Sequence, residues 1–394
     1  LGLYFNLAAW AVLVLIAFFA ADYYGEPVLV PVLTLIGLAT VLATPMAILS
    51  AKLTIEQRFS DLAKVTTLSA ILRQSLTIAL ALLGAGLFSL VIPMAIEPLF
   101  LAAGLYFVLR SWPRAKKVTK RDLTELFRST KWTMMSSLAQ SLNQYGQYIS
   151  ISFFIEVKLL GNYFFASALI ASIMTLIVTP LSQVMLPSLS ACADDKEEHQ
   201  RLYRKAIWGS LLLGTLLGYG VYALIGPLMH LFWDGKWDAS IATAQWMGLQ
   251  LTGFLAQVLA LTTIESKGLW KTRLKLDLIL GGGIVLISAI AVQFTHNISY
   301  IAITITLFCA VNLVGLLLFV SSKLDVSMRA TMRTLLIVWL LPLAVALGIE
   351  ECVSRFVVVD QFHTHLALLV AISMYCTALF YRSEHWPWPA TDTP

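Results

Sequence analysis

The sequence predicts an all-α protein that crosses a membrane many times. Hydrophobic residues make up 59% of the chain and charged residues only 12%, and the mean hydropathy is +0.81. Soluble domains keep about a quarter of their residues charged, so a buried core does not explain this deficit. The apolar residues also fall in runs of about 20, the length at which a helix crosses the hydrocarbon core of a bilayer.

Twelve apolar runs are long enough to be membrane spans. Each is expected to be helical, because a helix satisfies its backbone hydrogen bonds within its own segment, as lipid requires. Four runs precede a long basic interval, six follow it, and a final pair ends the chain. Their expected limits are 1–21, 28–50, 65–83, 87–109, 132–155, 162–190, 206–229, 240–262, 276–294, 299–320, 334–350 and 364–381.

The loops between these runs indicate which ends face the cytoplasm. Assigning alternate loops to one side places 23 of the 27 Lys and Arg residues there, whereas the opposite loops contain only Lys158, Lys236 and Arg355. Cytoplasmic loops of membrane proteins carry such an excess of basic residues. The basic side consists of the segments 51–64, 110–131, 191–205, 263–275 and 321–333 and of Arg382 in the tail. We therefore expect these loops and the C-terminus in the cytoplasm.

The basic interval from Arg110 to Lys131 divides the chain, and it contains eight of the 27 basic residues. We interpret it as a cytoplasmic linker and not as a nucleic-acid-binding patch, because membrane-length segments flank it and it offers no aromatic platform for stacking bases. The predicted divisions are an incomplete N-terminal lobe (1–109), the linker (110–131), a C-terminal lobe (132–320) and a terminal helix pair with a tail (321–394).

A short repeat relates the two lobes. The tripeptide Thr54-Ile55-Glu56 recurs as Thr263-Ile264-Glu265, and the same offset keeps four successive loops in phase. The first four spans then correspond to spans seven to ten, so partners of spans five and six are expected before the first residue. The complete plan would be fourteen spans, two pseudo-repeated six-helix lobes plus the terminal pair. Transporters built this way place their substrate between repeats.

Several motifs resemble the Wzx-type polysaccharide flippases of the multidrug/oligosaccharidyl-lipid/polysaccharide exporter superfamily. The segment Leu160–Ala166 (LGNYFFA) and the later Met185–Ser190 (MLPSLS) are similar to the pattern LG-x-Y-x-x-A followed by P-x-x-S. Gln57-Arg58, the segment 83–90 and Gly235-Lys236-Trp237 are similar to the family in the same order. One departure is Gln147, which stands near the position where many relatives carry an Asp.

The resemblance implies a two-lobed helical bundle with a central cavity that alternates between the two faces of a bacterial inner membrane. Its substrate would be an undecaprenyl-diphosphate-linked oligosaccharide, carried outward for O-antigen, capsule or exopolysaccharide synthesis. Expected partners are this lipid-linked oligosaccharide and membrane lipids, with polysaccharide polymerase machinery as a further candidate and no nucleic acid. A cation-coupled drug exporter of the same superfamily is the alternative.

Span five carries four amides on one helical face. Gln140, Asn143, Gln144 and Gln147 follow the spacing i, i+3, i+4, i+7. They could hydrogen-bond sugar hydroxyls in a wet cavity, or they could tie the span to a neighbouring helix. We favour the cavity and predict that they bind substrate. Interhelical hydrogen bonding is the expectation for the isolated amides Gln183, Gln250, Gln257 and Asn312.

Arg73 and Glu97 are the charged residues that we place deep in the predicted spans. A tight turn at Gly84-Ala85-Gly86 joins their spans, so the two side chains could meet near the middle of the bilayer. A lone charge at that depth costs at least about 2.5–3.5 kcal/mol, which favours a functional role. We predict that Arg73 attracts the diphosphate while Glu97 positions it or carries a proton. A purely structural ion pair is the alternative.

No constellation typical of an enzyme occurs in the sequence. Gly281-Gly282-Gly283 lacks the Lys-Ser/Thr of a phosphate loop and is expected to allow close helix packing. His363 and His365 lack a third metal ligand, so we expect them to be solvated. The acidic residues of 194–198 read as a solvated loop, which disfavours a glycosyltransferase or polymerase. We therefore predict no catalytic residues, no metal and no cofactor.

Overall fold

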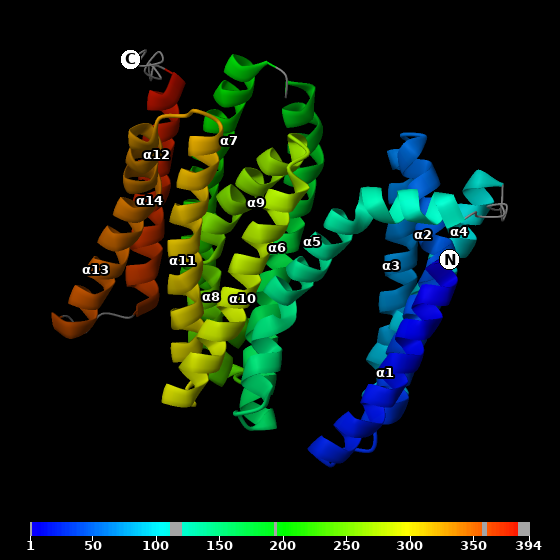
Figure 1. The fold of residues 1–394 in the computed structure, drawn as a ribbon. Helices are drawn as coiled ribbons and strands as arrows, with labels where there is room; N and C mark the ends of the chain where they lie inside the picture. The colour runs from blue at the N-terminus through cyan, green and yellow to red at the C-terminus, as the bar shows by residue number, and fades with distance from the viewer. Residues whose placement is uncertain (1, 111–119, 193–194, 357–360, 385–394) are drawn as a thin grey trace. The chain divides into compact units, whose positions relative to one another are not determined.

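The computed structural model describes residues 2–110, 120–192, 195–356 and 361–384, and every element within these ranges is helical (Figure 1). The first helices are α1 (Gly2–Tyr24), α2 (Leu29–Ile55), α3 (Phe59–Leu82), α4 (Phe88–Leu109), α5 (Lys120–Ser152), α6 (Val157–Ala191) and α7 (Lys196–Trp233). The remainder are η1 (Asp238–Ser240), α8 (Ile241–Gly248), α9 (Leu251–Ser266), α10 (Trp270–Phe294), α11 (Ile298–Lys323), α12 (Met328–Thr334), η2 (Leu335–Leu340), α13 (Leu341–Phe356) and α14 (Gln361–Glu384).

The chain is a polytopic α-helical membrane protein. Within the described residues, ten helices are long and apolar enough to cross a membrane, and the pair formed by 238–248 and α9, bent by 45°, raises the number to eleven. The predicted span 132–155 falls on α5, which is helical but not among these. Its basic first turns and its amide side chains make it too polar. The total of fourteen spans and the pairing of two lobes remain predictions.

The chain divides into two compact units, 1–119 and 120–394. In the first unit, α2 packs against α1 and α4, and α4 packs against α3. Leu49, Leu53 and Leu105 form its buried core. The predicted tight turn between α3 and α4 is present, and its Gly84 and Gly86 have φ values of 78° and 53°. Most side chains are strained in this left-handed region, so glycine is favoured at both positions.

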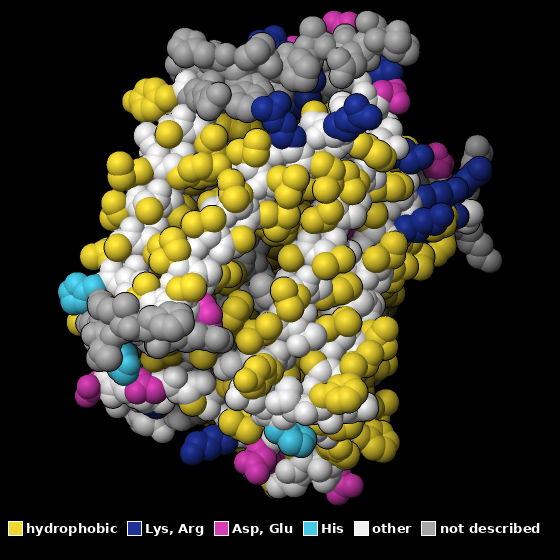
Figure 2. All heavy atoms as spheres, turned by 90° about the vertical axis from the view of Figure 1, so that its left-hand side faces the viewer, with side chains coloured by type: hydrophobic (Ala, Val, Ile, Leu, Met, Phe, Trp, Pro, Cys, Tyr) yellow, Lys and Arg dark blue, Asp and Glu magenta, His cyan; other side chains and the backbone are white. Residues whose placement is uncertain are grey.

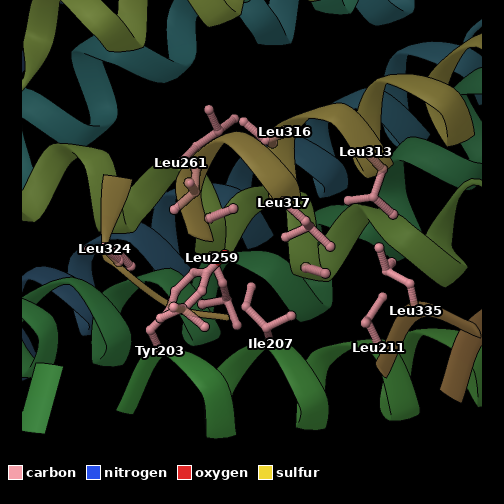
Figure 3. Close-up of a cluster of buried hydrophobic side chains, with 14 of the residues drawn as sticks. Tyr203, Ile207, Leu211, Leu259, Leu261, Leu313, Leu316, Leu317, Leu324 and Leu335 are labelled. Atoms are coloured by element: carbon pink, nitrogen blue, oxygen red, sulfur yellow. The ribbon is translucent and has the colours of Figure 1, made fainter. Parts of the chain in front are cut away.

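The second unit contains α5 to α14, including the terminal helices and the second half of the predicted linker. Its central packing joins α7, α9, α11 and the π-helical segment η2. Buried leucines from these helices form one cluster, which has Tyr203 of α7 at one edge (Figure 3). A second cluster joins α5, α6, α8, α10 and α11 around the fully buried Tyr163. The terminal helices α13 and α14 pack against each other and against α7.

The terminal helices expose an apolar face suited to lipid. Leu336, Leu340, Val345 and Ile349 are exposed on η2 and α13. Figure 2 shows that hydrophobic side chains cover the middle of this face, while Lys and Arg gather mainly at one end. Lipid tails solvate exposed apolar side chains of this kind, whereas charged side chains remain at the membrane surface.

At the basic end of the second unit, an exposed ion pair links the start of α7 to the turn after α11. Lys196 Nζ at the start of α7 lies 2.6 Å from Asp325 Oδ2 in the turn after α11. The hydrogen bond and the charge of Lys196 lower the pKa of Asp325. Asp325 itself has a φ of 54°, a conformation that Asp tolerates better than most residues.

Candidate functional site

The second unit contains a cavity of about 1310 Å³. Its walls come from α5, α6, α8, α9, α10, α11, η2 and α13, so the first of the terminal helices contributes to it. The α8–α9 break lies in the wall, and Gln250 at this break donates to Thr306 Oγ1 of α11 at 3.1 Å. This bond agrees with the interhelical role expected for Gln250. Gln257 also lines the cavity, and the side chain of Gln183 lies outside the described residues.

All four predicted amides of α5 line this cavity. The spacing of i, i+3, i+4, i+7 places them on one helix face, as the sequence indicates. Gln147 Oε1 accepts a hydrogen bond from the Tyr163 hydroxyl at 2.8 Å. Asn143 Oδ1 is buried, with no hydrogen-bond partner among the described residues. Gln140 and Gln144 are exposed, so their amides are available to a ligand.

Glycines on α10 allow two neighbouring helices to approach closely. A methyl group on Gly281 would overlap the Asn143 side chain of α5, and one on Gly283 would overlap the Phe308 ring of α11. On the α5 side, Gly146 lies against Val285 of α10 in the same manner. The predicted packing role is therefore confirmed for Gly281 and Gly283, and the α5–α10 contact at Gly281 and Gly146 holds the amide face beside the cavity.

Sequence reasoning missed a buried cluster of three charges at one end of this cavity. Arg273 Nε lies 2.8 Å from Asp277 Oδ2, and Arg273 NH1 lies 2.9 Å from Glu265 Oε1. Ser136 of α5 donates to Asp277 Oδ2 at 2.6 Å, whereas Asp277 Oδ1 is buried with no partner among the described residues. The side chains of Arg273 and Asp277 are only 10% and 0% exposed. Two carboxyl groups therefore surround one guanidinium.

The predicted limits of span nine explain why the cluster was missed. We placed residues 263–275 in a cytoplasmic loop, but α10 begins at Trp270 and Arg273 lies inside it. Lys271, Arg273 and Lys275 lower the local hydropathy and hide the start of the helix. Arg273 and Asp277 are four residues apart, the spacing of an ion pair on a helix, and this signal could have found them.

In the first unit, Arg73 and Glu97 form an ion pair. Arg73 Nε lies 3.2 Å from Glu97 Oε2, and their side chains are 37% and 30% exposed. This pairing agrees with the tight turn that joins α3 and α4. The contact is electrostatic and does not meet hydrogen-bond geometry, since Arg73 Nε is buried without such a partner among the described residues. Both residues belong to a different unit from the amide face.

The prediction for His365 needs correction. His365 is not solvated: it is 7% exposed, and its Nε2 lies 2.8 Å from Glu350 Oε1. The packing of α14 against α13 and α7 buries it. No cluster of three or more His, Cys, Asp or Glu residues in the described ranges could hold a metal.

Comparison with known proteins gives a family and a fold. A sequence family described as "Polysaccharide biosynthesis protein" matches residues 1–242. No curated protein matches the chain. A solved structure, described as the outward-facing conformation of a multidrug resistance MATE family transporter of the MOP superfamily, superposes with a TM-score of 0.56 at 12% identity. The superposition covers 82% of this chain and 77% of that one, and at this identity it shows the fold alone.

Proposed function

This chain belongs to the polysaccharide biosynthesis protein family and has the fold of a MOP-superfamily transporter, and we propose that it carries a lipid-linked oligosaccharide across the membrane. The substrate is an undecaprenyl-diphosphate-linked glycan, moved from the cytoplasmic to the periplasmic leaflet of a bacterial inner membrane by alternating access. The transported glycan is used for O-antigen, capsule or exopolysaccharide synthesis, in which polysaccharide polymerase machinery receives it on the periplasmic side.

The amide face of α5 supports this proposal most directly. Gln140, Asn143, Gln144 and Gln147 all line one cavity, together with Tyr145 and Tyr148. Amides both donate and accept hydrogen bonds, as sugar hydroxyls do. Aromatic rings offer flat apolar surfaces for the C–H faces of sugars. The α5 face of the cavity can therefore hydrogen-bond an uncharged polar chain without a charged partner.

The size of the cavity favours an oligosaccharide over a small drug. Its volume of about 1310 Å³ exceeds the roughly 300–1,000 Å³ of pockets that hold drug-sized ligands. Arg273 is already paired with Glu265 and Asp277, so this end of the cavity offers no free cation to a diphosphate among the described residues. We therefore assign this cavity to the glycan, while the polyprenyl tail stays in lipid. The role of Arg73 in attracting the diphosphate is a separate proposal that does not depend on this cavity.

A cation-coupled drug exporter is the second candidate. The buried carboxylates of Glu265 and Asp277 beside the cavity favour it, because such groups can accept a proton or bind a cationic compound. The amide variants described next distinguish the flippase from the exporter. Loss of glycan export with normal drug tolerance supports the flippase. Loss of drug tolerance with normal glycan export supports the exporter.

Replacing the exposed amides tests the proposal. Gln140→Ala combined with Gln144→Ala should reduce surface glycan at least about fivefold, because each of the two lost hydrogen bonds costs roughly 0.5–1.5 kcal/mol. Surface glycan is measured in cells whose own flippase has been deleted, with protein levels checked in the membrane. Gln293→Ala is the matched control, because this amide is exposed on α10 away from the cavity. Normal export by the double variant would reject this site.

The proposed orientation is testable by labelling. A cysteine at Lys271 should react with an impermeant maleimide only after the inner membrane is permeabilised, and one at Gly235 should react in intact spheroplasts. This follows from the basic loops facing the cytoplasm. Reaction at Lys271 in intact spheroplasts would reverse the topology.

A further inference from the structure

Two lysines from different helices lie beside the ring of one tryptophan on the basic side of the second unit. Lys131 Nζ of α5 lies 5.2 Å from the centroid of the Trp132 ring, and Lys271 Nζ of α10 lies 5.1 Å from it. A cation within about 6 Å of an aromatic ring is attracted to its face. The indole therefore holds two ammonium groups near each other, and an ammonium group keeps N–H donors that an anion can accept.

The packing of α5 against α10 holds this arrangement in place. One turn after Trp132, the Ser136 hydroxyl donates a hydrogen bond to Asp277 Oδ2 of α10 at 2.6 Å. Farther along the two helices, Gly281 lies directly against Asn143. A binding surface that is already ordered loses less conformational freedom when its ligand arrives. The two helices thus present the lysines as one preformed surface.

The cations of this surface lack carboxylate partners. Four basic side chains form no ion pair with any residue that the structure describes, and they are Arg128, Lys131, Lys271 and Lys275. Along the described side chains of α5 and α10 the carboxylates are Glu125 and Asp277, and Asp277 is already paired with Arg273. Four cations accompanied by the one free carboxylate of Glu125 leave an excess of three positive charges. The surface therefore fits an anionic ligand.

This surface faces away from the cavity. Lys131 is nine residues before Gln140, and nine residues make two and a half turns of a helix, so the two side chains lie on opposite sides of α5. Lys271 and Lys275 are each two residues from Arg273, which is about 200° around α10. Gln140 and Arg273 line the cavity. The lysines are therefore on the outer side of both helices, where lipid and not the glycan is the neighbour.

Exposed apolar side chains continue this outer side toward the middle of the membrane. Leu278 and Ile279 are exposed on α10, and a methyl group on Gly282 would meet no atom within 4 Å. On α5, Met135 and Leu138 are exposed in the two turns that follow the lysine. Cations at the membrane surface above an apolar stripe match the two parts of a phospholipid, a charged headgroup and its acyl chains.

We propose that Lys131, Trp132 and Lys271 bind the phosphate of an anionic phospholipid, whose acyl chains lie along the apolar stripe of α5 and α10. In the proposed orientation this lipid belongs to the cytoplasmic leaflet, where anionic lipids attract basic segments of membrane proteins. Tryptophan is common at this depth, because its ring is apolar and its N–H is polar. A zwitterionic lipid carries its own cation and cannot supply the missing negative charge.

Native mass spectrometry of the purified protein in detergent micelles tests this proposal without a transport assay. The first bound dioleoylphosphatidylglycerol should bind at least about tenfold more tightly than dioleoylphosphatidylcholine. Lys131→Gln combined with Lys271→Gln should weaken phosphatidylglycerol binding at least about tenfold, because each basic residue near an anionic lipid contributes about fivefold. Lys205→Gln combined with Arg329→Gln is the matched control. It removes the same charge from exposed sites on α7 and α12 and should leave the binding unchanged.

Trp132→Leu provides a second variant, because it keeps both charges and removes the ring that positions them. It should weaken phosphatidylglycerol binding several-fold, and unchanged binding would contradict the site. Equal binding of the two phospholipids by the wild-type protein would overturn the proposal, as would a lysine double variant that keeps the preference.

Undecaprenyl diphosphate is the competing anionic lipid and is titrated in the same way. The proposal is wrong if this lipid alone binds in a manner that depends on Lys131 and Lys271, because the surface would then serve the transported substrate. All of these measurements are independent of glycan export, so this proposal and the proposed function can fail separately.

Discussion

Replacing Arg273 by methionine should destabilise the second unit strongly. Arg273 neutralises Asp277, whose side chain is fully buried, and it also contacts Glu265. Methionine retains much of the side-chain volume, so the change removes charge and hydrogen bonds more than packing. Asp277 would keep only the hydrogen bond from Ser136 at 2.6 Å, and its carboxylate would remain buried beside a second one.

The size of the effect follows from this burial. Removing one partner of a buried ion pair costs about 3–5 kcal/mol, because the other charge is left without compensation. Removing both partners costs less, since no unpaired charge remains. The double variant Arg273→Met with Asp277→Leu should therefore be more stable than Arg273→Met alone, although Glu265, 19% exposed, loses its partner in both.

Chemical unfolding in detergent micelles, followed by circular dichroism, measures these differences. Lys275→Met is the matched control, because Lys275 is exposed on the same helix and surface changes usually stay within about 0.5 kcal/mol. The reasoning would be refuted if Arg273→Met cost no more than Lys275→Met. The single variant Asp277→Leu completes the comparison. The reasoning would also be refuted if the loss of unfolding free energy in the double variant equalled the sum of the losses in Arg273→Met and Asp277→Leu, because the two charges would then not be coupled.

Two further predictions concern the first unit and the α5–α10 contact. Arg73→Gln should abolish glycan export at normal protein levels, and the swap of Arg73→Glu with Glu97→Arg should restore folding without restoring export; full export by the swapped protein would show that the pair is only structural. Gly281→Ala should lower stability by about 1–3 kcal/mol in the same unfolding assay, because the added methyl group overlaps α5. Gly282→Ala should be neutral or stabilise by up to about 1 kcal/mol, because its methyl group meets no atom within 4 Å and alanine favours a helix over glycine. Equal costs at both positions would contradict the packing described.

Much of this protein follows from sequence patterns that are local. The length of an apolar run is a property of consecutive residues, so the positions of the helices are predictable to within a few residues except where basic residues extend a helix, as at the start of α10. The amide face of α5 follows from helical periodicity alone. The turn at Gly84 and Gly86 follows from the conformational freedom of glycine.

The partners of the buried charges depend on which helix faces meet, and only the tertiary structure decided this. Ser136 and Asp277 are 141 residues apart in the chain, and Tyr222 and Glu350 are 128 apart. Periodicity gives the face of one helix but not the helix that covers it. For this reason His365 reads as a solvated residue near a helix end in the sequence, yet the docking of α14 on α7 and α13 buries it against Glu350.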